Sequence, residues 1–143
     1  MRVRRSLAAA TLYATILYSP AALTHGAIAV GQPASVAKDG VAIGYTWNYD
    51  TPGQAEADAL KQCLSFMDAP DSTRALCKVA RTFSHQCVAI SLDPAAGTEG
   101  FGWSVSPTQQ VASDAALQQC RDSDGPEHAA ACQMSAQECD VKP

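Results

Sequence analysis

The amino-acid sequence predicts an α+β fold built from two related halves. Each half contains a triplet of cysteines, a strand with an aromatic-x-tryptophan pattern before it, and an alanine-rich segment that ends in a cysteine. The triplets are Cys63, Cys77, Cys87 and Cys120, Cys132, Cys139. This order of strand, strand, helix and strand, used twice, predicts an antiparallel or mixed sheet with two helices on one face, linked by disulfides.

The N-terminus has the layout of a secretory signal. Arg2, Arg4 and Arg5 precede an apolar run at residues 6–18, and small, turn-forming residues follow at 20–27. The run is too short to span a bilayer, and no later apolar stretch predicts a membrane helix. We therefore expect residues 1–25 to be a signal peptide and residues 26–143 to form one domain in the periplasm or outside the cell, where disulfides persist.

The charge of the chain restricts its partners. The chain has fourteen acidic and ten basic residues, and loss of the three signal arginines would leave seven basic residues, a formal charge of about minus seven. This charge disfavours nucleic acid and anionic membranes as partners, and it favours a basic protein or a cationic ligand.

Short strands are predicted at residues 27–30, 41–49, 78–83, 88–92, 100–105 and 133–137. The second strand alternates most clearly, and its larger side chains share one face: Val41, Ile43, Tyr45, Trp47 and Tyr49. The opposite face carries smaller residues, which would let a helix or a strand approach closely: Ala42, Gly44, Thr46 and Asn48.

Two helices are expected between these strands. Thr51 is predicted to cap the first helix, with Pro52 at its first position and Gln54 completing a capping box. The buried stripe of this helix is Ala55, Ala59, Leu60 and Cys63. The second helix should begin near Ser106 or Thr108, and its apolar residues are Val111, Ala112, Ala115, Ala116 and Cys120.

The spacing of repeated residues indicates an internal duplication, with halves at about 26–87 and 88–139. Cys63 and Cys120 are 57 residues apart, as are Gln62 and Gln119, while Trp47 and Trp103 are 56 apart. Repeat symmetry favours the disulfides Cys63–Cys77 and Cys120–Cys132 within the halves, with Cys87–Cys139 joining them. Other pairings stay open, because six cysteines combine in many ways.

Two surfaces are candidates for partner binding. The first is an aromatic and polar edge before the first helix, at Asn48, Tyr49 and Asp50, since such residues are favoured at interfaces. The second is the connection after that helix, which mixes apolar and acidic residues: Phe66, Met67, Asp68 and Asp71. Alternatively, Phe66 and Met67 complete the helix and cap the core. Trp47 and Trp103 recur in both halves, which favours packing between sheet and helix over ligand stacking.

The sequence identifies no catalytic residue, metal site or cofactor. A hydrolase would need His85 with Ser84, Ser91 or Asp93, yet no motif positions a serine against this histidine. Residues 122–127 resemble the opening of a calcium loop, but the glycine is misplaced and Gln133 stands where a full loop has glutamate. A solvated turn at the end of a helix is the favoured interpretation.

The motifs together resemble a known family. The segments at residues 26–30, 55–63 and 77–79, with the paired aromatic-x-tryptophan strands, are similar to the bacterial exported family catalogued as domain of unknown function 4189. The resemblance covers nearly all of the expected mature chain and implies a small, disulfide-linked extracytoplasmic domain. It brings no catalytic residues. The connection at residues 64–76 is longer than the usual link of this family.

These observations favour an exported protein-binding factor without catalytic activity. An inhibitor or immunity-type protein against an envelope-active enzyme fits the acidity and the disulfide rigidity of the chain. The alternatives are a structural or envelope-interaction module and, with less support, a hydrolase using His85. No cofactor is expected, and the partner is expected to be another protein.

Overall fold

The computed structural model describes residues 23–141 and confirms an α+β fold. The predicted signal peptide lies almost entirely outside the described residues. The elements are β1 (His25–Gly31), α1 (Val36–Asp39), β2 (Ala42–Tyr49), α2 (Pro52–Leu64), α3 (Asp71–Arg74), β3 (Lys78–Phe83), β4 (Cys87–Leu92), β5 (Phe101–Ser106), α4 (Gln109–Asp124), η1 (Ala129–Ala131) and β6 (Gln133–Cys139). All six predicted strands and both long helices are present, whereas α1, α3 and η1 are short elements that the sequence pattern did not reveal.

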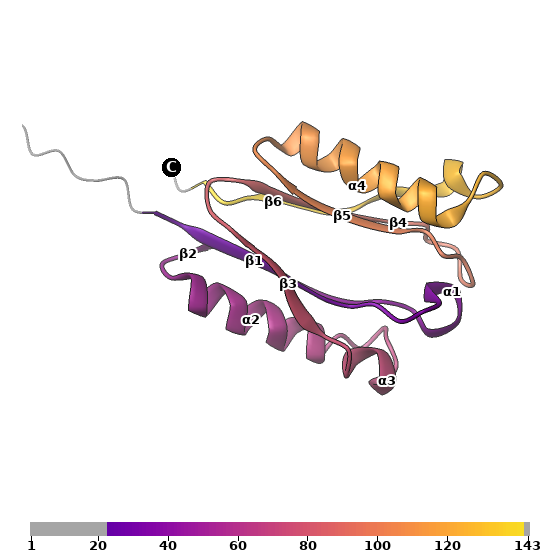
Figure 1. The fold of residues 1–143 in the computed structure, drawn as a ribbon, viewed down its shortest axis with the longest axis horizontal. Helices are drawn as coiled ribbons and strands as arrows, with labels where there is room; N and C mark the ends of the chain where they lie inside the picture. The colour runs from indigo at the N-terminus through magenta and orange to yellow at the C-terminus, as the bar shows by residue number, and fades with distance from the viewer. Residues whose placement is uncertain (1–22, 142–143) are drawn as a thin grey trace, which may run out of the picture.

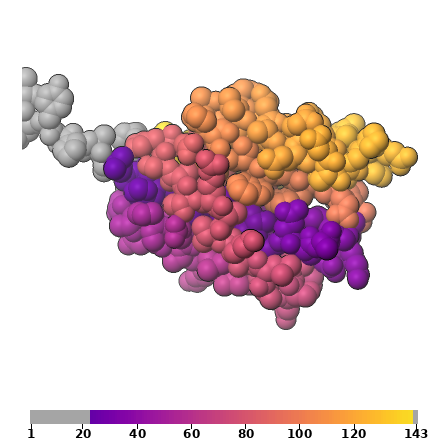
Figure 2. All heavy atoms as spheres, viewed as in Figure 1, coloured from indigo at the N-terminus to yellow at the C-terminus, as the bar shows by residue number. Residues whose placement is uncertain are grey.

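The strands form two antiparallel sheets, where the sequence predicted one. Their orders are β2-β1-β3 and β5-β4-β6, so each half of the chain builds its own sheet with the same topology. Figure 1 shows four layers, with α2 and α4 on the two outer faces. In Figure 2 the second half lies on the first along a broad boundary. The two helices therefore cover opposite sides of the molecule.

Large side chains explain why the sheets pack against each other. The buried cluster between them takes branched and aromatic residues from both halves: Ile28, Val30, Val41, Ile43, Phe83, Val88, Ile90, Phe101 and Val105. Burial of side chains of this size stabilises the fold by roughly 1.5 to 3 kcal/mol each. The inner face of each sheet is therefore apolar, and neither half could leave it exposed to water.

Small side chains explain the close approach of each helix to its sheet. Alanines dominate both contacts, including Ala55 and Ala59 on α2 and Ala112 and Ala116 on α4. A Cβ at Gly44 would lie 2.0 Å from the Ala59 carbonyl oxygen. The expectation of small residues beneath a helix is confirmed. Thr51 and Thr108 cap the helices by accepting the N–H groups of Gln54 and Val111.

The repeat register differs from the one that the tryptophans suggested. Gln62 Oε1 accepts a hydrogen bond from the Tyr45 N–H at 3.3 Å. Gln119 Oε1 accepts one from the Trp103 N–H at 3.2 Å. Trp103 is therefore the equivalent of Tyr45. The first half has one more residue between strand and helix, at Asn48. The predicted sheet-to-helix packing of the tryptophans was also wrong, because Trp103 packs against the cluster between the sheets. Trp47 stacks on Tyr45, with ring centroids 5.8 Å apart.

The three disulfides are the pairs that repeat symmetry favoured. Cys63–Cys77 and Cys120–Cys132 each join the end of a long helix to the start of the next strand. Cys87–Cys139 was expected to join the halves, but it links β4 to β6 inside the second sheet, where the two residues are register partners. The reason is that Cys87 already belongs to the first strand of the second half.

Within residues 23–141, hydrogen bonds connect the halves at two places. Glu99, in the β4–β5 loop, accepts the Ser35 hydroxyl at 2.6 Å and the Val36 N–H at 2.7 Å at the start of α1. These hydrogen bonds hold the pKa of Glu99 below its ordinary value, and the bond from the Ser35 hydroxyl is the largest cause. At the other place the Asp140 carboxylate binds the backbone of the first half. In the described part of the chain, no helix is long and apolar enough to cross a membrane.

Candidate functional site

A shallow cleft at the start of α2 is the candidate functional site. Its volume is about 410 Å³, and it is lined by Asn48, Tyr49, Asp50, Gln54, Ala57 and Asp58. We call it the acidic cleft, because its lining contains two carboxylates and no lysine or arginine. The three residues that the sequence singled out before α2 all line it.

An irregularity in β2 shapes the acidic cleft. Asn48 has a φ of 61°, and the register between β1 and β2 shifts at this point. Such left-handed backbone is uncommon for residues other than glycine. It reverses the alternation of the strand, so Tyr49 packs against the alanine cluster beneath α2. The sequence had predicted that Tyr49 would share the face of Tyr45. Bulges of this kind often turn a side chain toward a functional site.

A buried carboxylate holds this irregular backbone in place. Asp140 is fully buried, and its oxygens accept the N–H of Asn48 at 2.8 Å and the N–H of His85 at 3.1 Å. Asn48 and His85 are the two residues other than glycine with positive φ in the described chain. Sequence reasoning did not identify Asp140. Its position one residue after the last cysteine did not predict this role, because the backbone groups that it binds are distant in sequence.

Tyr49 and Asp58 form the polar contact of the acidic cleft. The Tyr49 hydroxyl donates to Asp58 Oδ2 at 2.5 Å. This hydrogen bond is the main cause that raises the pKa of Tyr49, followed by burial and the charge of Asp58. Tyr49 therefore keeps its proton at neutral pH and orients the carboxylate of Asp58. Asp58 was not among the predicted site residues, although its position one turn after Gln54 places it on the same end of α2.

The second predicted surface lies at the other end of α2. Helix α2 has thirteen residues, and at 1.5 Å per residue its ends are about 20 Å apart. Phe66 is partly buried against the alanine cluster, whereas Met67 is 82% exposed. The alternative interpretation, in which both residues cap the core, is therefore confirmed for Phe66 and wrong for Met67. Asp68 and Asp71 are exposed beside them. The structure does not join this segment to the acidic cleft.

The residues considered for a hydrolase are not brought together. His85 precedes β4 and Asp93 follows it, so a six-residue strand of about 20 Å separates them. The Ser84 hydroxyl donates to the Thr24 carbonyl, and the Ser91 hydroxyl donates to the Ala116 carbonyl at 2.6 Å. Both serines thus have structural partners. His85 lies in the turn between β3 and β4, as its sequence context suggested.

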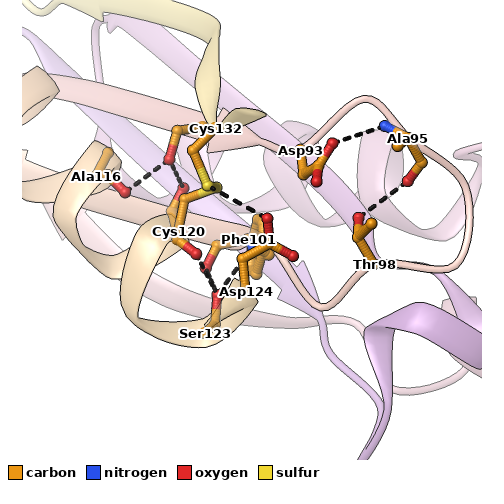
Figure 3. The surroundings of a disulfide bond; sticks show 11 residues. Asp93, Ala95, Thr98, Phe101, Ala116, Cys120, Ser123, Asp124 and Cys132 are labelled. Carbon is orange, nitrogen blue, oxygen red and sulfur yellow. Dashed lines mark hydrogen bonds between the residues drawn. A yellow bond between two sulfur atoms is a disulfide. The ribbon is translucent and has the colours of Figure 1, made fainter. Parts of the chain in front are cut away.

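The segment that resembled a calcium loop forms the end of α4. Helical backbone extends through Asp124, so residues 122–125 do not wrap around a central point. Asp122 accepts a hydrogen bond from Gln118, while Asp124 lies with Asp93 beside the Cys120–Cys132 disulfide (Figure 3). Within residues 23–141, no group of three or more His, Cys, Asp or Glu side chains is arranged to hold a metal ion.

Comparison with known families places the chain. The sequence profile of the family described as Domain of unknown function (DUF4189) matches residues 25–139. The chain belongs to this family. The match begins with β1 and ends with the last cysteine, so the DUF4189 domain is the whole four-layer fold. Searches of curated proteins and of solved structures gave no match.

The acidic cleft of this DUF4189 domain is suited to binding a cation. Its carboxylates lie at the surface, and the Tyr49 hydroxyl fixes one of them in a defined orientation. A carboxylate held in this way accepts charge-assisted hydrogen bonds from an ammonium or guanidinium group. Because Tyr49 is a proton donor with a raised pKa, it is poorly suited to act as a base or nucleophile at neutral pH. At neutral pH the cleft therefore presents a hydroxyl that donates a hydrogen bond and carboxylates that accept them.

Proposed function

We propose that this DUF4189 domain is an exported, non-catalytic protein-binding factor. Its acidic cleft binds a lysine or arginine of a basic partner, and the partner is an envelope-active enzyme that the domain inhibits in the manner of an immunity protein. The net acidity of the chain supports a basic partner, because complementary charge increases the rate of encounter.

The observation that carries the proposal is the Tyr49–Asp58 hydrogen bond, which exists in one half only. The halves share their helix–sheet contacts, and Ala59 and Cys63 of α2 match Ala116 and Cys120 of α4. By this register the equivalent of Asp58 is Ala115. The fold therefore does not require a carboxylate at this position. A feature that the fold does not require is a stronger candidate for recognition than one that both halves share.

The rigidity of the acidic cleft also supports a binding role. Asp140 fixes Asn48 through a partly buried hydrogen bond, and Cys63–Cys77 anchors the far end of α2. A preformed site loses less conformational entropy when it binds than a mobile one. Inhibitors that dock into the groove of an enzyme are typically pre-organised in this way.

The proposal is tested by crosslinked affinity capture followed by measurement of binding. The tagged chain without residues 1–22, with its three disulfides oxidised, would be exposed to periplasmic extract, and the captured protein identified by mass spectrometry. Calorimetry with the purified partner would then compare the wild type with Asp58→Asn and Tyr49→Phe. Asp114→Asn is the matched control, because Asp114 is an exposed acid on α4.

We expect one stoichiometric basic partner, whose enzymatic activity falls when the domain is added. Asp58→Asn should weaken binding about tenfold or more, since hydrogen bonds to charged groups contribute roughly 1.5 to 3 kcal/mol. Tyr49→Phe should have a smaller effect, and Asp114→Asn none. Unchanged affinity in Asp58→Asn would exclude the acidic cleft as the interface. A bound partner that keeps its activity would exclude inhibition and favour an envelope-interaction module.

A further inference from the structure

A pair of carboxyl groups in the second half lies outside the acidic cleft and its proposed function. Asp93 follows β4, and Asp124 is the last residue of α4 (Figure 3). A Cβ at Gly100 would lie 2.7 Å from Asp93 Cβ and 2.9 Å from Asp124 Oδ2, so both acids pack against the same glycine. Elements distant in sequence thus bring two carboxyl groups into contact.

The oxygens of this pair are only partly satisfied. Asp93 is 8% exposed, and its Oδ1 accepts the Ala95 N–H at 2.8 Å. Asp124 accepts the Gly100 N–H. When both groups are ionised, Asp93 Oδ2 and Asp124 Oδ1 are buried without a hydrogen-bond partner among the described residues. Buried, unpaired carboxylate oxygens are energetically costly.

A positive charge placed between the two carboxyl groups would offset this cost. The ionisable groups that act on Asp124 are Asp93 and His128. Burial, the hydrogen bond to Asp93 and the charge of Asp93 raise the pKa of Asp124, while His128 opposes this. Among the described side chains, neither carboxylate has an ion pair with lysine or arginine. The protein thus supplies negative charge at this point without a matching positive group.

We propose that Asp93 and Asp124 form a binding site for a divalent cation of the calcium type. The unpartnered donors are both hard oxygen atoms, which Ca²⁺ prefers. The cysteines beside the pair form the Cys120–Cys132 disulfide and offer no thiolate. The ion would be reached from the depression of about 430 Å³ whose lining includes Asp93, Thr98 and Gly100.

Two carboxylates give modest affinity, because water must complete the coordination shell. Extracellular calcium modules bind with dissociation constants on the order of 10⁻⁴ to 10⁻³ M, and we expect a value in this range. Binding should weaken as the pH falls, since protons compete for the same two oxygens.

Calorimetry of the oxidised chain, after treatment with a chelator, tests the site. CaCl₂ would be titrated at pH 7.5 and at pH 5 into the wild type, Asp93→Asn and Asp124→Asn. Asp122→Asn is the matched control, because Asp122 is an exposed acid on α4 whose described side-chain hydrogen bond, from Gln118, lies within that helix. We expect one Ca²⁺ per chain at pH 7.5, binding at least tenfold weaker in either site variant, and no change in the control.

Thermal unfolding provides a second readout if one variant folds poorly. A concentration of 10 mM CaCl₂ should raise the Tm of the wild type by roughly 5 °C and leave that of Asp124→Asn unchanged. Absence of both heat and Tm shift in the wild type would overturn the proposal. Equal binding in the wild type and both site variants would also overturn it, because other carboxylates would then be the ligands.

Discussion

In the first half of the molecule Gly44 lies against the backbone of α2, and in the second half Gly102 lies in the same way against α4. A Cβ would approach the Ala59 carbonyl oxygen to 2.0 Å in one case and the Ala116 carbonyl oxygen to 2.2 Å in the other. The same glutamine of each helix accepts an N–H from the neighbouring edge strand. These repeated contacts are requirements of the fold, because each half meets them with the same residue type.

The halves differ in what is added to this shared set of contacts. The first half has the bulge at Asn48 and the Tyr49–Asp58 hydrogen bond. The second half has Cys87–Cys139 and the Asp93–Asp124 pair. Because the two halves share one topology, one half serves as the control for the other. Residues without a counterpart need an explanation other than the fold, and they carry both of our proposals.

The disulfides should show the largest difference between the halves. Cys87–Cys139 closes 52 residues, whereas Cys63–Cys77 closes 14 and Cys120–Cys132 closes 12. Loop-closure entropy predicts that replacing the long-range pair by alanines lowers the free energy of unfolding by about 4 kcal/mol, against about 3 kcal/mol for each repeated pair. Urea unfolding followed by circular dichroism measures all three.

The two short-loop variants control for each other, since their disulfides are equivalent in the repeat. If these two variants lost clearly different amounts of unfolding free energy, the two halves would not be equivalent in this respect. One half would then tolerate a mobile helix end better than the other. A cost for the Cys87–Cys139 variant below that of both would show that loop length does not decide the ranking.

The glycines beneath the helices should have the next largest effect, and an equal one. Gly44→Ala and Gly102→Ala each force a Cβ against helix backbone that has little room to move, and we expect each to cost about 2 to 3 kcal/mol in urea unfolding. Gly53→Ala is the control, because nothing lies within 4 Å of a Cβ at this position of α2. It should be neutral or slightly stabilising. A tolerated substitution in one half alone would show that its helix can shift away from the sheet.

The repeated features could be predicted from sequence because local patterns encode them. The cysteine spacing, the cap at Thr51 and the alanine stripes indicated the elements and the disulfide pairs. The division into two sheets could not be predicted, because the alternation in a strand does not show whether its apolar face meets a helix or another sheet. A pattern of large residues on one face and alanines on the other was the available signal.

The features that are present in only one half were harder to predict. Asn48 and Tyr49 were identified, but the left-handed backbone at Asn48 depends on Asp140, which is 92 residues away in sequence. Asp93 was considered as a partner of His85, and Asp124 as part of a loop. Their actual contact joins β4 to the end of α4 at Gly100, and this depends on tertiary packing that no local pattern records.

The smallest expected effect is the pH dependence that the Asp93–Asp124 pair adds to the second half. Because the pKa of Asp124 is raised in the folded state, the folded protein holds this proton more tightly than the unfolded chain does. The resulting stabilisation is present at low pH and is lost as the pH rises through the folded pKa. Asp124→Asn replaces the proton with an amide that donates to Asp93 at every pH, so the variant should lack this decline.

In chelator at pH 7, Asp124→Asn should therefore be more stable than the wild type, by less than about 1 kcal/mol because solvent screens a half-buried group. Near pH 3 the advantage should disappear. Thermal unfolding between pH 3 and pH 8, with Asp122→Asn as the control, measures the difference. If the two curves ran parallel, the pKa of Asp124 would not be raised in the folded state, and the electrostatic distinction between the halves would fail at this site. A difference that grows with pH and is suppressed by Ca²⁺ would instead show that the metal binds at this pair of carboxyl groups.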